Sequence, residues 1–130
     1  MSSFTTPLML EYLDGTIWRL SKPFIYYSDL CGEEKREWIR VPMGFITDFA
    51  SIPQILWIIE RPTGLHGKAA VLHDWLYQNG LYTRKVCDMI FREAMEVSGV
   101  EPWRREAMYY AVRTFSSKYY KKKLDSTEIV

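Results

Sequence analysis

The chain has 130 residues, of which 48% are hydrophobic and 15% aromatic; this excludes a disordered protein and predicts a single folded domain over residues 1–130. Seventeen Lys and Arg residues against sixteen Asp and Glu residues leave a net charge of +1, so charge gives no reason to expect a nucleic-acid partner. Two cysteines, without metal-site spacing, are too few for a disulfide framework and fit a reducing compartment.

The N-terminus and the apolar runs indicate no membrane or secretory targeting. MSSFTTPLML lacks the basic start and the long apolar segment of a secretory signal. The longest apolar run, ILWII at 55–59, is far too short to span a bilayer. We therefore expect no transmembrane segment and a location in the cytoplasm.

Residues 1–44 are expected to be mainly strands. PLMLEYL and TIWRLS flank Asp14 and Gly15, which predicts a hairpin around an Asp-Gly turn. PFIYYSDL and REWIRVPM flank CGEEK, a second turn, and both runs are rich in β-branched and aromatic residues. These patterns predict a small N-terminal antiparallel sheet.

Residues 45–66 are expected to form a loop with one short helix. The segment GFITDFASIP mixes turn formers with polar side chains and ends at a proline, which predicts a loop. Residues 52–59 are expected to form the short helix, and RPTGLHG is expected to connect it to the next helix.

Residues 67–120 are expected to be helical. This segment begins with residues that recur at the spacing of a helix: Ala70, Leu72, His73, Leu76 and Tyr77. This predicts a helix over 67–79, and Thr83 is a suitable N-cap for a second helix to about Val97. Pro102 opens a third helix that is expected to reach about Tyr119.

The fold class is therefore α+β: a small N-terminal antiparallel sheet, then an antiparallel helical hairpin and a third helix, with a polar tail at 121–130. Apolar side chains at helical spacing on the last two helices are expected in the core. They are Met89, Phe91, Met95, Met108, Tyr109 and Phe115.

Charged residues inside two apolar runs are the strongest functional signal. VLHDWLYQNG holds His73 and Asp74, and RKVCDMIFREAM holds Asp88; buried charges are rare unless they are paired or bind something. In an antiparallel hairpin centred between residues 80 and 81, residues whose numbers sum to about 161 stand at the same height. His73 should therefore face Asp88 within about 3.5 Å, and Tyr77 should be level with Arg84. An aspartate opposite a histidine orients a general base.

Asp74 points about 100° away from His73, towards the preceding loop, which carries Asp48. Two carboxylates with loop carbonyls would make an oxygen-rich site suited to Ca²⁺. Other interpretations stay open. His73 can be a satisfied core histidine, Asp48 can cap a helix that starts near Ser51, and Ser51 can be a nucleophile with His73 and Asp88.

Several motifs carry a family resemblance. HDWLY resembles the His-Asp signature of secreted phospholipases A2, and TRKVCDMIF, MYYAVRTFS and the upstream TDFASIP resemble the bacterial and fungal branch, over residues 46–116. TDFASIP followed by AVLHDWLY also resembles an uncharacterised family of short tailed-phage and prophage proteins. Leu76 stands where the phospholipases have a cysteine, and their paired disulfides are absent.

The phospholipase resemblance implies a helical core that hydrolyses a phospholipid or other ester. It implies that His73 is the general base, that Asp88 holds His73, and that Tyr77 hydrogen-bonds Asp88. The ligands it implies for Ca²⁺ are Asp74, Asp48 and the main-chain carbonyl of Phe49.

The phage resemblance implies a protein made in the cytoplasm of a bacterial host, with incorporation in the virion and contacts to virion proteins as one outcome. The leading hypothesis is a phage-encoded phospholipase A2-like hydrolase that uses Ca²⁺. The alternatives are a non-enzymatic virion or assembly protein and a host-defence antagonist that binds a protein or a small ligand. An enzyme needs its charged residues to converge on an open cleft, whereas a structural part needs them only buried and paired.

Overall fold

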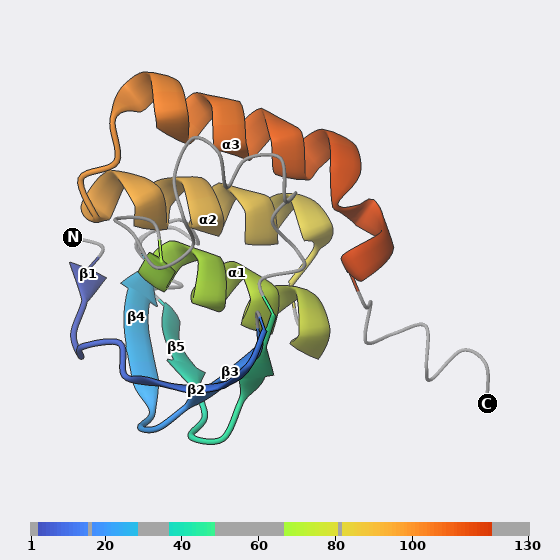
Figure 1. Ribbon diagram of the computed structural model, residues 1–130. Coiled ribbons are helices and arrows are strands. Elements are labelled where there is room, and N and C mark those ends of the chain that lie inside the picture. Colours follow the sequence, from blue (N-terminus) through green and yellow to red (C-terminus); the bar gives the residue numbers. More distant parts are fainter. Residues whose placement is uncertain (1–2, 16, 29–36, 49–66, 81, 121–130) are drawn as a thin grey trace.

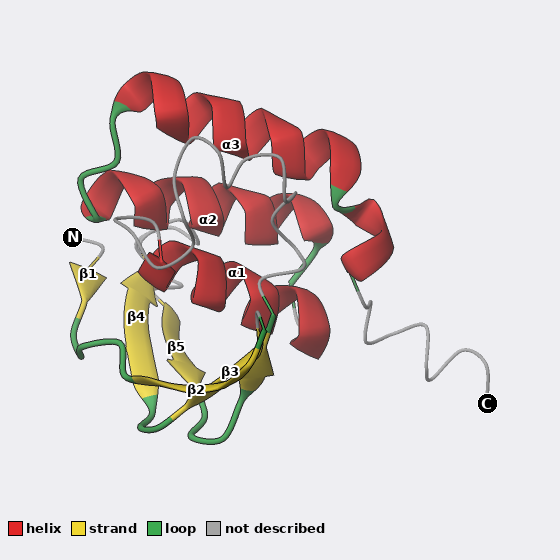
Figure 2. Cartoon of the chain, in the orientation of Figure 1, coloured by secondary structure: helices red, strands yellow, loops and turns green. Residues whose placement is uncertain are grey.

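The computed structural model shows a sheet-containing N-terminal part followed by three helices (Figure 2), which confirms the α+β class. It describes the whole chain except residues 1–2, 16, 29–36, 49–66, 81 and 121–130. The predicted CGEEK turn, the predicted helix over 52–59 and the predicted polar tail lie outside the described residues.

One antiparallel sheet has the order β1-β4-β5, with β1 at Ser3–Phe4, β4 at Phe24–Ser28 and β5 at Glu37–Val41. Alternate residues of β4 are buried, as the period of two in a strand requires. Tyr26 is on the buried face, whereas Ile25 faces away from it. The strand therefore has a face for the helices and a face that points outward.

A second sheet has the order β2-β3-β6, with β2 at Leu10–Asp14, β3 at Ile17–Leu20 and β6 at Ile46–Thr47. The predicted hairpin is confirmed, and Gly15 has the positive φ of 56° that its tight turn requires. The loop predicted over residues 44–53 is wrong in part, because β6 pairs with β3 there. A two-residue strand shows no alternation in sequence, and its pairing depends on a distant partner.

The three helices are α1 at Gly67–Asn79, α2 at Arg84–Val97 and α3 at Pro102–Phe115. The predicted N-cap is confirmed, because the Thr83 side chain accepts a hydrogen bond from the backbone N–H of residue 86. Among the described residues, no helix combines the length and the hydrophobicity that are needed to cross a membrane.

The third helix ends earlier than predicted. The α-helical part stops at Phe115, and a 3₁₀ turn over Ser117–Tyr119 follows it. In this turn the N–H of Tyr119 bonds to the carbonyl of Ser116, an i→i+3 bond that tightens the chain at a helix end. The expected extension to Tyr119 therefore belongs to a different helix type.

The helices lie above the strands in Figure 1, with α3 outermost and α2 between α1 and α3 in this view. Helix α2 also reaches the β1-β4-β5 sheet directly. Of the predicted core residues, Phe91, Met95 and Met108 are completely buried. Met89 and Phe115 are 37% and 63% exposed, so their prediction as core was wrong. They point off the apolar stripes of α2 and α3, and α3 has no described element on its outer side.

Candidate active site

The two residues singled out by the hairpin geometry meet in the core. His73 Nε2 lies 2.6 Å from Asp88 Oδ1, and both side chains are 0% exposed. The predicted hydrogen bond between them is confirmed. Gly80, with a φ of 64°, ends α1 and allows the short connection that places α1 and α2 side by side.

Asp88 accepts two further hydrogen bonds from different helices. The Tyr77 hydroxyl donates to the same Oδ1 at 2.6 Å, which is the contact that the phospholipase resemblance implies. Arg113, on α3, donates to Oδ2 at 2.7 Å. Both carboxylate oxygens of Asp88 therefore accept hydrogen bonds, and residues of α1 and α3 bind the same side chain on α2.

These donors decide the charge of Asp88. Burial alone would raise the pKa of Asp88, but the hydrogen bonds from His73, Tyr77 and Arg113 outweigh burial and hold the pKa below its usual value. An ionised carboxylate can only accept, so His73 Nε2 must carry a hydrogen. In the neutral ring, the basic nitrogen is then Nδ1.

The neighbours of Asp88 are held in one protonation state. Burial, followed by the hydrogen bond and charge of Asp88, raises the pKa of Tyr77, which stays a hydroxyl donor. The hydrogen bond to Asp88 raises the pKa of Arg113, which stays charged. Burial and the charge of Asp88 raise the pKa of Cys87 to about 12, so this free cysteine stays a thiol and is a poor nucleophile.

Arg84 supports the same cluster from the start of α2. Its Nε donates to the Tyr77 hydroxyl at 3.2 Å, which confirms that the two residues stand at one level. Its Nη2 donates to the main-chain carbonyls of Val112 and Arg113. Carbonyls at a helix C-terminus lack partners within the helix, so Arg84 joins the start of α2 to the end of α3.

The sequence alone did not assign a role to Arg113, although a signal was present. Arg113 is a lone charge in the apolar run MYYAVRTF, and a charge in such a run requires a partner. Its partner is Asp88, which no spacing rule connects to a third helix.

Asp74 is also buried, at 3% exposure, but it points to a different neighbour. The Thr47 hydroxyl donates to Asp74 Oδ2 at 2.5 Å, so the segment that carries Asp48 reaches Asp74 as expected. The Asp48 side chain is exposed, and Phe49 lies outside the described residues. Within the described part of the chain, no group of three or more His, Cys, Asp or Glu side chains could hold a metal ion. The calcium site stays a prediction.

Comparison with known proteins places the chain in a family. Residues 18–112 match the family described as "Protein of unknown function (DUF1353)". The chain belongs to this family. The match contains all of α1 and α2, with His73, Asp74 and Asp88. The expected membership of an uncharacterised family is thereby confirmed, whereas the phage and phospholipase links stay predictions.

Two curated relatives come from Sinorhizobium fredii. The chain is 40% identical over 77 residues to "Uncharacterized protein y4jT", a match that covers 58% of this chain and 23% of that protein. It is 26% identical over 107 residues to "Uncharacterized protein y4iH", covering 70% of this chain and 45% of the relative. The chain thus spans less than half the length of both relatives. No solved structure matches it significantly.

Proposed function

We propose that this protein is an ester hydrolase in which His73 is the general base and Asp88 positions it. The observation that supports this most is the bond of 2.6 Å between Nε2 and a completely buried, ionised carboxylate. Such a partner fixes the ring orientation and the tautomer, and with a hydrogen on Nε2 the basic nitrogen of the neutral ring is Nδ1.

The proposed reaction consists of one water attack and one bond cleavage. Nδ1 of His73 takes a proton from water while the water oxygen bonds to the ester carbonyl carbon. The charge of Asp88 stabilises the imidazolium that forms, and the imidazolium then returns the proton to the leaving alcohol as the C–O bond breaks. Tyr77 and Arg113 are positioning residues, because they hold Asp88 and do not touch the reacting atoms.

The phospholipase resemblance implies a phospholipid as the ester and Ca²⁺ as a cofactor. Asp74 and Asp48 would hold the ion, which polarises an ester carbonyl and stabilises an oxyanion when it is bound. The contact between Thr47 and Asp74 supports this pairing, since Thr47 is the residue before Asp48. Within the described part of the chain these donors do not make a complete ligand set, so the calcium site is proposed separately from the position of the base.

Hydrolysis of mixed phospholipid vesicles and of a soluble short-chain ester tests the proposal. His73→Gln should lower turnover by about 10²–10⁴-fold, because the general base is lost. Tyr110→Phe, which alters an exposed tyrosine of α3, should leave turnover unchanged. Circular dichroism of both variants checks that the fold is retained. Absence of hydrolysis in the wild-type protein on both substrates, with and without Ca²⁺, would rule out the hydrolase.

The calcium prediction has its own test. Activity on phospholipid should vanish in chelator and return with calcium, and Asp74→Asn should abolish calcium binding in a calorimetric titration. The absence of calcium binding up to about 10 mM, beyond the weak extracellular range, would end this part of the proposal. The general base would then be tested by the metal-free ester assay alone.

A non-enzymatic role is the second candidate. His73 and Asp88 are both 0% exposed and paired, and Asp88 is hydrogen-bonded by donors from two neighbouring helices. Burial and pairing are all that a structural part requires of such residues. A virion or assembly protein, or an antagonist of host defence, would keep the cluster for this reason. His73→Gln would then lower stability without any hydrolytic activity to lose.

A further inference from the structure

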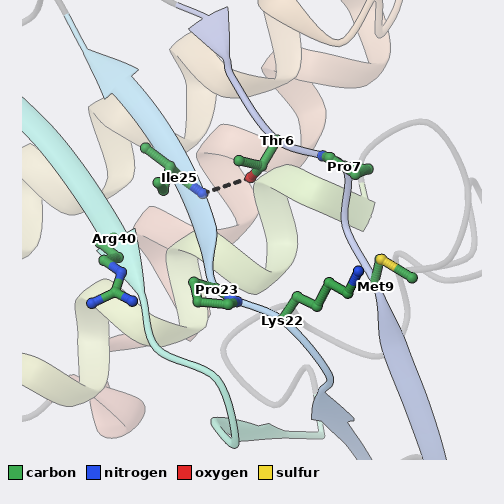
Figure 3. A pocket seen from close by; sticks show the side chains of 7 residues that line it. All are labelled: Thr6, Pro7, Met9, Lys22, Pro23, Ile25 and Arg40. Carbon is green, nitrogen blue, oxygen red and sulfur yellow. Dashed lines mark hydrogen bonds between the residues drawn. The ribbon is translucent and has the colours of Figure 1, made fainter.

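A pocket of about 440 Å³ lies on the outward face of the β1-β4-β5 sheet (Figure 3). Its size falls in the range of about 300–1,000 Å³ for pockets that bind small molecules. Ile25 and Arg40 are register partners on β4 and β5, and both contribute to its lining. Tyr26, the next residue on β4, points the opposite way and reaches Glu93 on α2. The pocket is therefore on the other side of the sheet from the helices that carry His73.

The charges of this pocket are all of one sign. Lys22 and Arg40 are the charged residues among the described ones that line it, and they stand on either side of Pro23 (Figure 3). Among the described residues, neither forms an ion pair, whereas Arg19, Arg92 and Arg113 each pair with a carboxylate. Two cations without a described acidic partner make a positive potential that favours an anion.

The remaining walls are mostly apolar and are held in place by the fold. Pro7, Met9, Pro23 and Ile25 supply the apolar surface. The Thr6 hydroxyl accepts a hydrogen bond from the Ile25 backbone N–H at 2.9 Å, which fixes the chain between β1 and β2 against β4. Two of the wall residues are prolines with restricted φ, so little backbone ordering is required when a ligand enters.

We propose that this pocket binds a small amphiphilic anion, with its oxyanion group at Lys22 and Arg40 and a short alkyl chain on the apolar walls. The two cations favour an anion over a neutral ligand, because only an anion gains from their positive potential. The apolar walls disfavour a bare inorganic anion, which would cover none of their surface. The proposal does not depend on the hydrolase, because the pocket is on the opposite face of the β1-β4-β5 sheet from the helices that carry Asp88 and His73.

Calorimetric titration of the full chain tests the ligand class. Hexanoate and hexyl phosphate carry the proposed groups, hexanol lacks the charge, and inorganic phosphate lacks the chain. At least one of the two amphiphilic anions should bind at least tenfold more tightly than hexanol and phosphate. The stronger of the two identifies a carboxylate or a phosphate as the preferred group. Equal binding of hexanol, or no binding by either anion, overturns the proposal.

Variants locate the binding. The double variant Lys22→Gln and Arg40→Gln should lose at least tenfold in affinity, and both residues are exposed, so the fold should be kept. Arg19→Gln removes an exposed arginine outside the pocket and should bind as the wild type does. His73→Gln should also keep its affinity, which separates this site from the proposed hydrolase. Unchanged affinity in the double variant would show that the ligand binds elsewhere.

Discussion

Two of the three carboxylates on helix α2, Asp88 and Glu93, face opposite neighbours. Asp88 is completely buried between helices and accepts hydrogen bonds from His73, Tyr77 and Arg113. Glu93 is partly buried and turns towards the sheet, where its Oε1 accepts from the hydroxyls of Tyr26 and Ser28. The same helix thus joins the helical layer through one carboxylate and the β1-β4-β5 sheet through the other.

The difference lies in the donors. Two of the groups on Asp88 are the His73 imidazole, which can take up and release a proton, and the Arg113 guanidinium, which stays charged. The described donors on Glu93 are the uncharged hydroxyls of Tyr26 and Ser28. A proton can therefore be moved at the first carboxylate, whereas the second only connects α2 to β4. For this reason we propose a catalytic site at Asp88 and a structural role for Glu93.

The largest expected effect is the loss of the Asp88 carboxylate. Asp88→Ala should lower the free energy of unfolding by about 3–5 kcal/mol, because it leaves His73 and Arg113 without their partner in a buried site. Asp88→Asn should cost less, since an amide oxygen still accepts. Urea unfolding measures both losses. Glu96→Ala, an exposed carboxylate on the same helix, is the control and should stay within about 0.5 kcal/mol. If both Asp88 variants also stay within about 0.5 kcal/mol of the wild type, the cluster does not stabilise the fold.

The charge of Asp88 should also make stability depend on pH. Its pKa is lower in the folded chain than the usual 3.8, so the folded state favours the ionised form. The contribution is therefore present above about pH 4 and is lost as the pH falls through the lower folded-state pKa. The gap in unfolding free energy between the wild type and Asp88→Asn should narrow as the pH falls from about 5 through the folded-state pKa. Tyr110→Phe should show a constant gap over this interval, and a constant gap for Asp88→Asn would mean that its charge is not stabilised.

Arg113 should have a smaller effect than Asp88, because its side chain is 31% exposed. Arg113→Gln should cost about 1–2 kcal/mol, a value reduced for solvent screening from that of a buried charged hydrogen bond. Lys85→Gln changes an exposed charge on α2 and is the control in the same urea measurement. A loss for Arg113→Gln no larger than the control would show that His73 and Tyr77 alone hold Asp88.

Local geometry explains which parts of the site could be predicted. A short connection between two helices fixes which residues face each other, so the pairs of His73 with Asp88 and of Tyr77 with Arg84 followed from their numbers. Arg113 could not be found in this way, because its position depends on how α3 packs across α2. Thr47 was not predicted as a donor either, because its contact with Asp74 also depends on how distant parts of the chain pack.

The sheets show the same limit. The hairpin of β2 and β3 was predictable from its Asp-Gly turn, which is a local signal. The two-residue strands β1 and β6 are defined only by their partners β4 and β3, far along the chain. The pocket was not predictable either, since sheet pairing alone brings Arg40 beside Ile25.

The smallest expected effect tests the second carboxylate. Tyr26→Phe removes the hydroxyl that donates to Glu93 but keeps the completely buried ring, so the core volume hardly changes. One hydrogen bond contributes about 0.5–1.5 kcal/mol net, and Ser28 still donates to the same oxygen, so a loss in this range is expected. Tyr110→Phe removes an exposed hydroxyl and should cost less. If Tyr26→Phe lowers the free energy of unfolding by about 3 kcal/mol or more, Glu93 is as important to stability as a buried charge pair. The proposed difference between Glu93 and Asp88 would then be wrong.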